Sequence, residues 1–298
     1  MTSFSAIDLE KLPAPNIVEA LDFETILESM LNDLRERAPE LTVNVESDPV
    51  YKILEVAAYR EVLLRSRVND ACRAVMLAYA TDDDLENLAV FFDVERQLVH
   101  PGDPTTIPPT LPVFELDSRL RTRTQLSLEG HSTAGPIGSY TFHALAADPR
   151  VKDVDIASPT PGEVVVTVLS TENIGVPTSE VLMLVESQLN SEDVRPLTDH
   201  VTMQAATIVR YNVVAELILF SGPDSTVVSD AANKALNTYI EAQHQLGRDI
   251  TLSGIYSALH QPGVQRVNLV EPTSDIVVQS HQAPWPDSIE ITFGGRDN

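Results

Sequence analysis

Histidine and acidic side chains are the residues of this chain whose types and spacing come nearest to chemistry. Asp199-His200, and His143 with Asp148, could each supply part of a catalytic triad. A triad also needs a nucleophile held in a special turn, and the sequence contains no GxSxG elbow. We therefore expect these histidines to make structural hydrogen bonds.

The densest group of carboxylates is Asp82-Asp83-Asp84 with Glu86. A calcium loop alternates its oxygen ligands around a conformationally special glycine, and this run contains no glycine. Thr81 directly precedes the run, which predicts a capped helix start whose acids favour the positive end of the helix dipole. The HExxH, Walker and GxGxxG motifs are also absent from the sequence. We therefore predict no catalytic residue, no metal site and no cofactor.

A long helix is the element that must position any functional surface in the first hundred residues. Asp48 suits the N-cap and Pro49 the first helical position. Apolar residues then recur every three or four positions to about Ala80, which predicts ~32 residues and roughly 48 Å. Such a helix is too long to be buried in its own small domain, so we predict that its apolar side binds a partner. The residues of this predicted seam are Ile53, Leu54, Ala57, Leu64, Val68, Ala71 and Val75.

Changes in composition divide the chain into segments. Residues 1–16 show no periodic pattern and are expected to form an extended N-terminal tail. Residues 17–100 contain no glycine and predict a helical arm. It begins with a helix at 17–38 and a short extended piece at Leu41, Val43 and Val45, before the long helix. Residues 101–112 contain five prolines and predict a semi-rigid linker.

Beyond the linker, strand and helix patterns alternate and predict two small α/β sandwich domains, 113–207 and 208–298. The fold class predicted for the whole chain is therefore α+β multidomain, with an N-terminal long-helix bundle arm. Residues 118–128 fit a strand or a short helix, and 201–219 one long strand or two. The other predicted elements are strands at 151–157, 163–170, 264–270, 276–279 and 289–293, and helices at 139–147, 178–189, 224–246 and 253–259.

Charge excludes some classes of partner. The chain carries 20 basic and 44 acidic side chains, a formal net charge of −24. The acids outnumber the bases in both parts, 20 to 9 in residues 1–100 and 24 to 11 afterwards. Nucleic acids and anionic membrane surfaces both require clustered Lys and Arg, so we expect neither as a partner. No stretch is apolar enough to span a bilayer, and the first residues do not resemble a signal peptide, so we expect the chain to stay where it is made.

Residues 47–81 carry a specific resemblance. They read SDPVYKILEVAAYREVLLRSRVNDACRAVMLAYAT and, with the following LENLA and VER, closely resemble the start of the phage baseplate assembly protein J family. The stretches STAGP, VKDVDIASPTPGEVVVTVLS, VRPLTD and LGRDI continue the resemblance in the same order, so it covers nearly the whole chain. Two departures are visible, Asp82-Asp83 and Asp93-Val94, where the family pattern has glycine. They leave the fold expectation intact and put only the local loop geometry in question.

The resemblance implies a structural subunit of the baseplate wedge in a contractile injection tail, and no enzyme. In such wedges two copies join one smaller subunit, of the tail protein I type, through a helical bundle. Copies from neighbouring wedges pair through their C-terminal domains and form a ring around the hub and spike. The implied partners are a second copy, the tail protein I-like subunit, the sheath initiator and the hub and spike proteins. Assembly in the bacterial cytoplasm, into a virion or a tailocin baseplate, is implied as well.

Two alternatives remain open at the level of sequence. One is an enzyme with an unrecognised site in the C-terminal α/β domains, which a cluster of perturbed titratable groups in a pocket would support. The other is a baseplate subunit of a related secretion system. Phage and bacteriocin sources are not distinguished by the residues.

Overall fold

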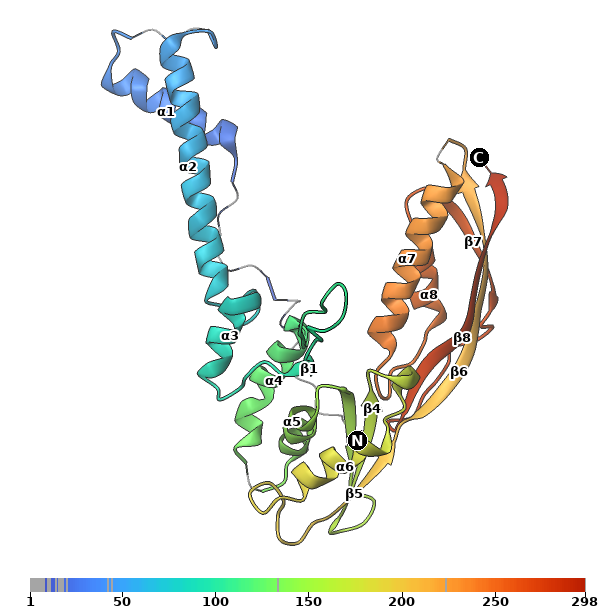
Figure 1. Cartoon of the computed structure of the whole chain (residues 1–298). Coiled ribbons are helices and arrows are strands. Elements are labelled where there is room, and N and C mark those ends of the chain that lie inside the picture. Colours follow the sequence, from blue (N-terminus) through green and yellow to red (C-terminus); the bar gives the residue numbers. More distant parts are fainter. Residues whose placement is uncertain are drawn as a thin grey trace. The chain divides into compact units, whose positions relative to one another are not determined.

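A computed structural model describes residues 9, 12, 13, 15, 19, 21–41, 43, 45–132, 134–222 and 224–297 (Figure 1). The chain divides into two compact units. The helical unit comprises the described residues up to Arg96 together with 116–124, and the sheet-containing unit comprises 97–115 and 125–297. Helices dominate the N-terminal region and three small sheets follow, so the predicted α+β multidomain class is confirmed.

The helical unit contains α1 (Phe23–Arg37), α2 (Pro49–Ala74), α3 (Asp82–Val90) and the first part of α4 (Asp117–Gly130). α2 begins as predicted, because the Asp48 side chain accepts a hydrogen bond of 2.8 Å from the Val50 amide. It has 26 residues and ends at Ala74, so the prediction of a helix to Ala80 was wrong. The next residues form turns instead, with hydrogen bonds from Met76 N to Arg73 O and from Tyr79 N to Met76 O.

The start of the arm also differs from its prediction. The first helix begins at Phe23 and not at residue 17, because the Asp22 side chain caps it by accepting a hydrogen bond from the Glu24 amide. Residues 17 and 18 and most of the predicted tail 1–16 lie outside the described residues. The extended piece predicted near Val43 is no strand where it is described, since residues 45–47 form a bend and turn.

One face of α2 contacts other parts of its own chain on both halves of the helix. α1 packs on the first half, where Ile26, Leu27 and Leu31 enclose Ala58 (Figure 1). On the second half, the buried Asn69 side chain accepts a hydrogen bond from the Glu19 amide (3.1 Å) and donates one to the Glu19 carbonyl (2.9 Å). Glu19 therefore lies on the same side of α2 as α1.

The proline-rich segment 101–112 forms a closed loop and no extended spacer. Its ends are β1 (Leu98–His100) and β2 (Val113–Phe114), which pair antiparallel, and Asp103 bridges Thr110 within the loop. The Asp103 amide donates to Thr110 O (3.2 Å) and the Thr110 amide to Asp103 O (3.0 Å). These bonds return the chain to its starting point, which the proline content alone does not reveal.

The first α/β part follows. Residues 118–128, which fitted a strand or a helix, lie within the helix α4. α5 (Ile137–Ala147) packs on β3 (Val151–Ala157). The sheet has the order β3-β4-β5, with β4 (Glu163–Ser170) antiparallel to β3 and parallel to β5 (His200–Ala205). A short 3₁₀ turn, η2 (Asn173–Gly175), and α6 (Ser179–Leu189) form the crossover from β4 to β5, and α6 packs on β5.

The second α/β part has a sheet of order β7-β6-β8, covered on one face by α7 (Ser225–Gln243) and α8 (Leu252–Leu259) (Figure 1). β6 (Thr207–Phe220) runs antiparallel to β7 (Val264–Glu271) and parallel to β8 (Gln282–Asp297). Residues 201–219 are thus two strands, which Ala206 separates. The core lies between sheet and helices and includes Leu217, Leu236, Ile255 and Leu259.

Two strand predictions in this part were wrong. Residues 276–279 form no strand, because Ile276 makes only a single bridge, to Ile250. The last strand starts at Gln282 and not at Ile289, although Pro284 and Pro286 lie within it. Proline is tolerated there because β8 is an edge strand, so the missing amides need no partner on its outer side.

Candidate assembly interface

The predicted seam lies mostly on the exposed face of α2. Ile53, Leu64, Val68 and Val75 are between 56% and 70% exposed, and Ala57 and Ala71 are exposed as well. Leu54 is the exception, because it is half-buried against α1. The six exposed positions form what we call the α2 stripe. It lies beside the face that α1 and Glu19 contact and is not covered by either of them, so it remains available to another helix.

Sequence reasoning missed part of this surface. Val56, Tyr59 and Leu63 are also exposed large side chains on α2. Their spacing of three and four residues was a readable signal. At 3.6 residues per turn they form a second apolar strip beside the α2 stripe, with Arg60 and Arg67 between the two. The exposed apolar surface is therefore wider than predicted and has a basic row through it.

Exposure of this kind favours association. Fully burying one aliphatic side chain of this size contributes about 1.5–3 kcal/mol of free energy. Because the large side chains of the α2 stripe are more than half exposed, more than half of that contribution is still available from burial against a partner. An uncovered apolar strip over about five turns of a helix is typical of a protein–protein contact. The β1–β2 loop is a second apolar projection, on which Ile107 is fully exposed and Leu111 nearly so.

Three of the residues weighed for chemistry, His143, Asp148 and Asp199, have structural partners. His143 Nε2 donates to the Gly130 carbonyl at 3.0 Å, and burial lowers the pKa of its imidazole. The Tyr140 hydroxyl donates to Asp199 Oδ2 at 2.8 Å, and burial followed by this hydrogen bond raises the pKa of the phenol. Within the described part of the chain, no group of three or more His, Cys, Asp and Glu side chains is placed to hold a metal ion.

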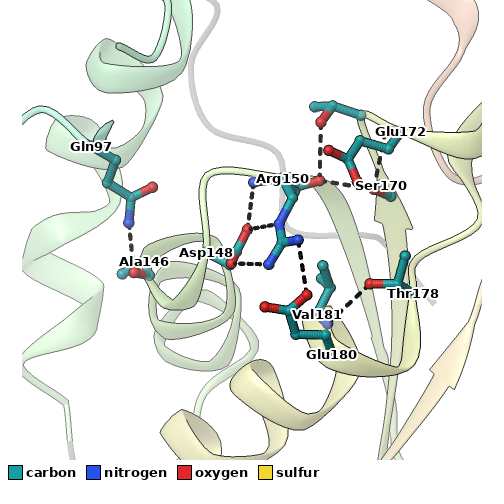
Figure 2. A network of polar contacts seen from close by, with 10 residues as sticks. Gln97, Ala146, Asp148, Arg150, Ser170, Glu172, Thr178, Glu180 and Val181 are labelled. Carbon is teal, nitrogen blue, oxygen red and sulfur yellow. Dashed lines mark hydrogen bonds and ion pairs between the residues drawn. The ribbon is translucent and has the colours of Figure 1, made fainter. Parts of the chain in front are cut away.

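Asp148 belongs to a polar network that holds the first α/β part together (Figure 2). Its carboxylate accepts hydrogen bonds from Nε and Nη2 of Arg150, both at 2.9 Å, and Glu180 of α6 approaches Nη1 at 3.3 Å. These hydrogen bonds raise the pKa of the Arg150 guanidinium. The Arg150 carbonyl accepts from Ser170 Oγ at 3.2 Å. Arg150 thus joins the end of α5 to β4 and α6, which is a structural role.

A second polar cluster joins the two α/β parts. The Asp153 carboxylate of β3 accepts hydrogen bonds from the Leu246 and Val154 amides, both at 2.9 Å. Burial of this carboxyl group raises its pKa to about 6 against the lowering effect of the two amides. His244 Nδ1 donates a hydrogen bond to the Pro284 carbonyl at 2.9 Å. The His244 ring packs edge-to-face against the Trp285 ring, with 4.6 Å between the ring centroids. We call this cluster the junction.

The arrangement defines a class of protein before any comparison. It is a multidomain α+β chain with an exposed helical seam, and the polar clusters described above serve its packing. None of the described helices is both long and apolar enough to cross a membrane.

Comparison with known proteins gives the family. Residues 46–103 match the baseplate J-like N-terminal domain, 132–205 the central domain and 211–292 the C-terminal domain. The chain is 47% identical over 298 residues to baseplate protein J of Escherichia phage P2, covering 98% of this chain and 99% of that protein. The chain belongs to the baseplate J family and is a structural subunit of a phage-type baseplate.

A solved structure of the anti-feeding prophage baseplate, symmetrised sixfold, contains a chain with a TM-score of 0.43 and 16% identity to this one. The match covers 60% of this chain and 44% of that chain.

Proposed function

We propose that the chain is a wedge subunit of a contractile tail baseplate. Two copies join one smaller subunit of the tail protein I type through a helical bundle, and α2 is this chain's contribution to the bundle. The observation that carries the proposal is the α2 stripe, whose large side chains stay exposed although α1 and Glu19 cover the adjacent face. The family membership supports it.

The α/β parts make the proposed contacts between wedges. Residues after Pro112, and 208–298 above all, make the contacts that link wedges into a ring around the hub and spike. The sheath initiator and the hub and spike proteins are the further partners, and assembly takes place in the bacterial cytoplasm. We propose binding and not catalysis as the activity, because the groups weighed as catalytic, His143, Asp148 and Asp199, have structural partners.

The test places charge in the stripe. In the double variant Leu64→Asp/Val68→Asp, two apolar contacts of the seam would be lost and two carboxylates would have to be removed from water if a bundle formed, so wedge assembly should fail. The control is Lys52→Gln/Arg73→Gln, which changes the net charge by the same −2 at exposed positions off the stripe.

Each variant is expressed with the other baseplate genes of its source, and the purified complexes are weighed by native mass spectrometry. We expect two copies of the control chain with one smaller subunit, and no such complex for the stripe variant. Circular dichroism checks that both variants keep their helices. Normal wedges from the stripe variant would refute the bundle.

A further inference from the structure

The charge on α2 differs in sign from that of the chain around it. Residues 49–74 hold five basic and three acidic side chains, within a protein of net charge −24. Lys52 pairs with Glu55, Arg65 with Glu61 and Glu19, and Arg73 approaches Asp70. Arg60 and Arg67 are exposed and form no ion pair with any residue that the structure describes. They are the two arginines between the apolar strips.

We propose that the α2 stripe accepts an acidic amphipathic helix from a different baseplate protein, and that Arg60 and Arg67 select it. The inference rests on the proposed function and specifies the chemistry of the partner. A helix that packs on the α2 stripe also covers the two guanidinium groups beside it. Buried guanidinium groups require carboxylates, which they bind in charge-assisted hydrogen bonds.

The spacing of the stripe fixes where those carboxylates lie. Leu64, Val68, Ala71 and Val75 follow the alternating four-and-three spacing of a coiled-coil seam. Arg60 and Arg67, seven residues apart, occupy the same position beside that seam. Side chains at this position meet the flanking residues of the facing helix and determine which partner and orientation are accepted.

A second copy of α2 does not fit this surface. In an antiparallel pair the flanking positions of the two copies meet, so arginine would face arginine. In a parallel pair Arg60 would face the Arg65 of the second copy. α1 of a second copy is acidic, but its apolar side already packs on α2 of its own chain. The complementary occupant is a helix with apolar residues at seam spacing and Asp or Glu beside them.

The test uses two designed 28-residue helical peptides as probes. Both carry Leu and Ile at the seam positions, and the flanking positions are all Glu in one and all Lys in the other. Binding to the full chain is measured by fluorescence anisotropy at low and high salt. The chain should bind the Glu peptide about tenfold or more tightly than the Lys peptide, and added salt should reduce the difference.

Charge reversal assigns the preference to the two arginines. Arg60→Glu/Arg67→Glu should invert the order of the peptides. Lys52→Glu/Arg73→Glu, with the same change in net charge at exposed positions off the α2 stripe, should keep the preference for the Glu peptide. Equal binding of the two peptides, binding of neither, or an unchanged order in the Arg60/Arg67 variant would overturn the inference.

The Leu64→Asp/Val68→Asp variant separates this inference from the bundle itself. If that variant blocks wedge assembly while Arg60→Glu/Arg67→Glu assembles normally, the bundle stands and the selection by charge is wrong. If both variants assemble normally, the proposed function fails as well. A homodimer of the isolated wild-type chain that Leu64→Asp/Val68→Asp abolishes, measured by sedimentation velocity, would show that a second copy is the occupant and would also overturn the inference.

Discussion

At the scale of single residues, Asp153 is the clearest case of an ionisable group used for structure. Its carboxyl group accepts two amide hydrogen bonds, yet its removal from water dominates and its pKa rises from 3.8 to about 6. The charged groups around it are Asp155 and Lys152 on its own strand, Glu241 at the end of α7, and Arg248 in the loop after α7. Asp153 is thus a titrating group within the junction.

The raised pKa has a definite sign for stability. The folded protein holds the Asp153 proton more tightly than the unfolded chain does, so its contribution is full below pH 3.8 and is lost as the pH rises through 6. A rise in pKa of this size corresponds to about 3 kcal/mol of unfolding free energy. As the pH rises from 4 to 7, the wild type should lose this contribution and Asp153→Asn should not. The unfolding free energy of Asp153→Asn should therefore increase by up to ~3 kcal/mol relative to that of wild type over this range.

Urea denaturation followed by the fluorescence of Trp285, the single tryptophan of the chain, measures this difference at the junction itself. Asp249→Asn is a control carboxyl substitution in the neighbouring loop. Parallel pH profiles for wild type and Asp153→Asn would contradict the expectation.

Residue-scale features also show how far sequence reasoning reached. The two departures from the family pattern, at Asp82 and Asp93, are both in the left-handed region, with φ of 49° and 58°. Glycine adopts this conformation at no cost, and aspartate is among the few other residues that tolerate it. The local geometry is therefore kept without glycine. The resemblance to the family identified these two positions, but the presence of aspartate alone did not predict the left-handed conformation.

At the scale of elements, the start of α2 was predictable and its end was not. Asp48 and Pro49 are local signals, and they act as predicted. The end depends on α4, because Arg121 donates to the Leu77 carbonyl at 2.8 Å and to the Ala80 carbonyl at 2.7 Å. These contacts join residues more than forty positions apart, so the periodicity of 50–80 carried no sign of them. All six residues of the α2 stripe belong to the predicted seam, whereas the seventh seam residue, Leu54, is half-buried against α1. A helical pattern shows which face is apolar but not which neighbour covers it.

The clamp between Asn69 and Glu19 yields a prediction for α2. Asn69→Ala removes both partners of the Glu19 backbone and should cost about 1–3 kcal/mol of stability in the helical unit. Hydrogen exchange measured by mass spectrometry should show faster exchange of the Glu19 amide. Asn87→Ala is the matched control, because that side chain bonds only to Asp83 O within its own helix and is exposed. An unchanged exchange rate at Glu19 in Asn69→Ala would contradict the role assigned to the clamp.

At the scale of the whole molecule, the described part of the chain passes three times between its two units, at 96/97, 115/116 and 124/125. The sequence predicted a boundary at residues 101–112 from proline content. The β1–β2 pair instead keeps this segment within the sheet-containing unit, a long-range pairing that composition does not reveal. Each unit has a core of its own, around Ala58 in one and around Leu217 in the other.

Separate cores predict separate unfolding transitions. Trp285 reports only on the sheet-containing unit, whereas far-ultraviolet circular dichroism reports on all helices. Asn69→Ala should shift the circular dichroism transition and leave the tryptophan transition in place, and Asp153→Asn should shift the tryptophan transition. A single transition seen by both probes and moved equally by both substitutions would show that the units unfold together.

The closed proline-rich loop has a practical consequence. Its base is fixed by β1, β2 and the Asp103–Thr110 bridge, and its tip at Ile107 is fully exposed. Lengthening a loop whose ends are already held together costs little free energy, since each doubling of its length adds only about 0.6 kcal/mol. A foreign epitope or fluorophore-binding peptide inserted beside Ile107 would therefore be displayed on the surface of a folded subunit, as a handle for imaging or for engineered cargo.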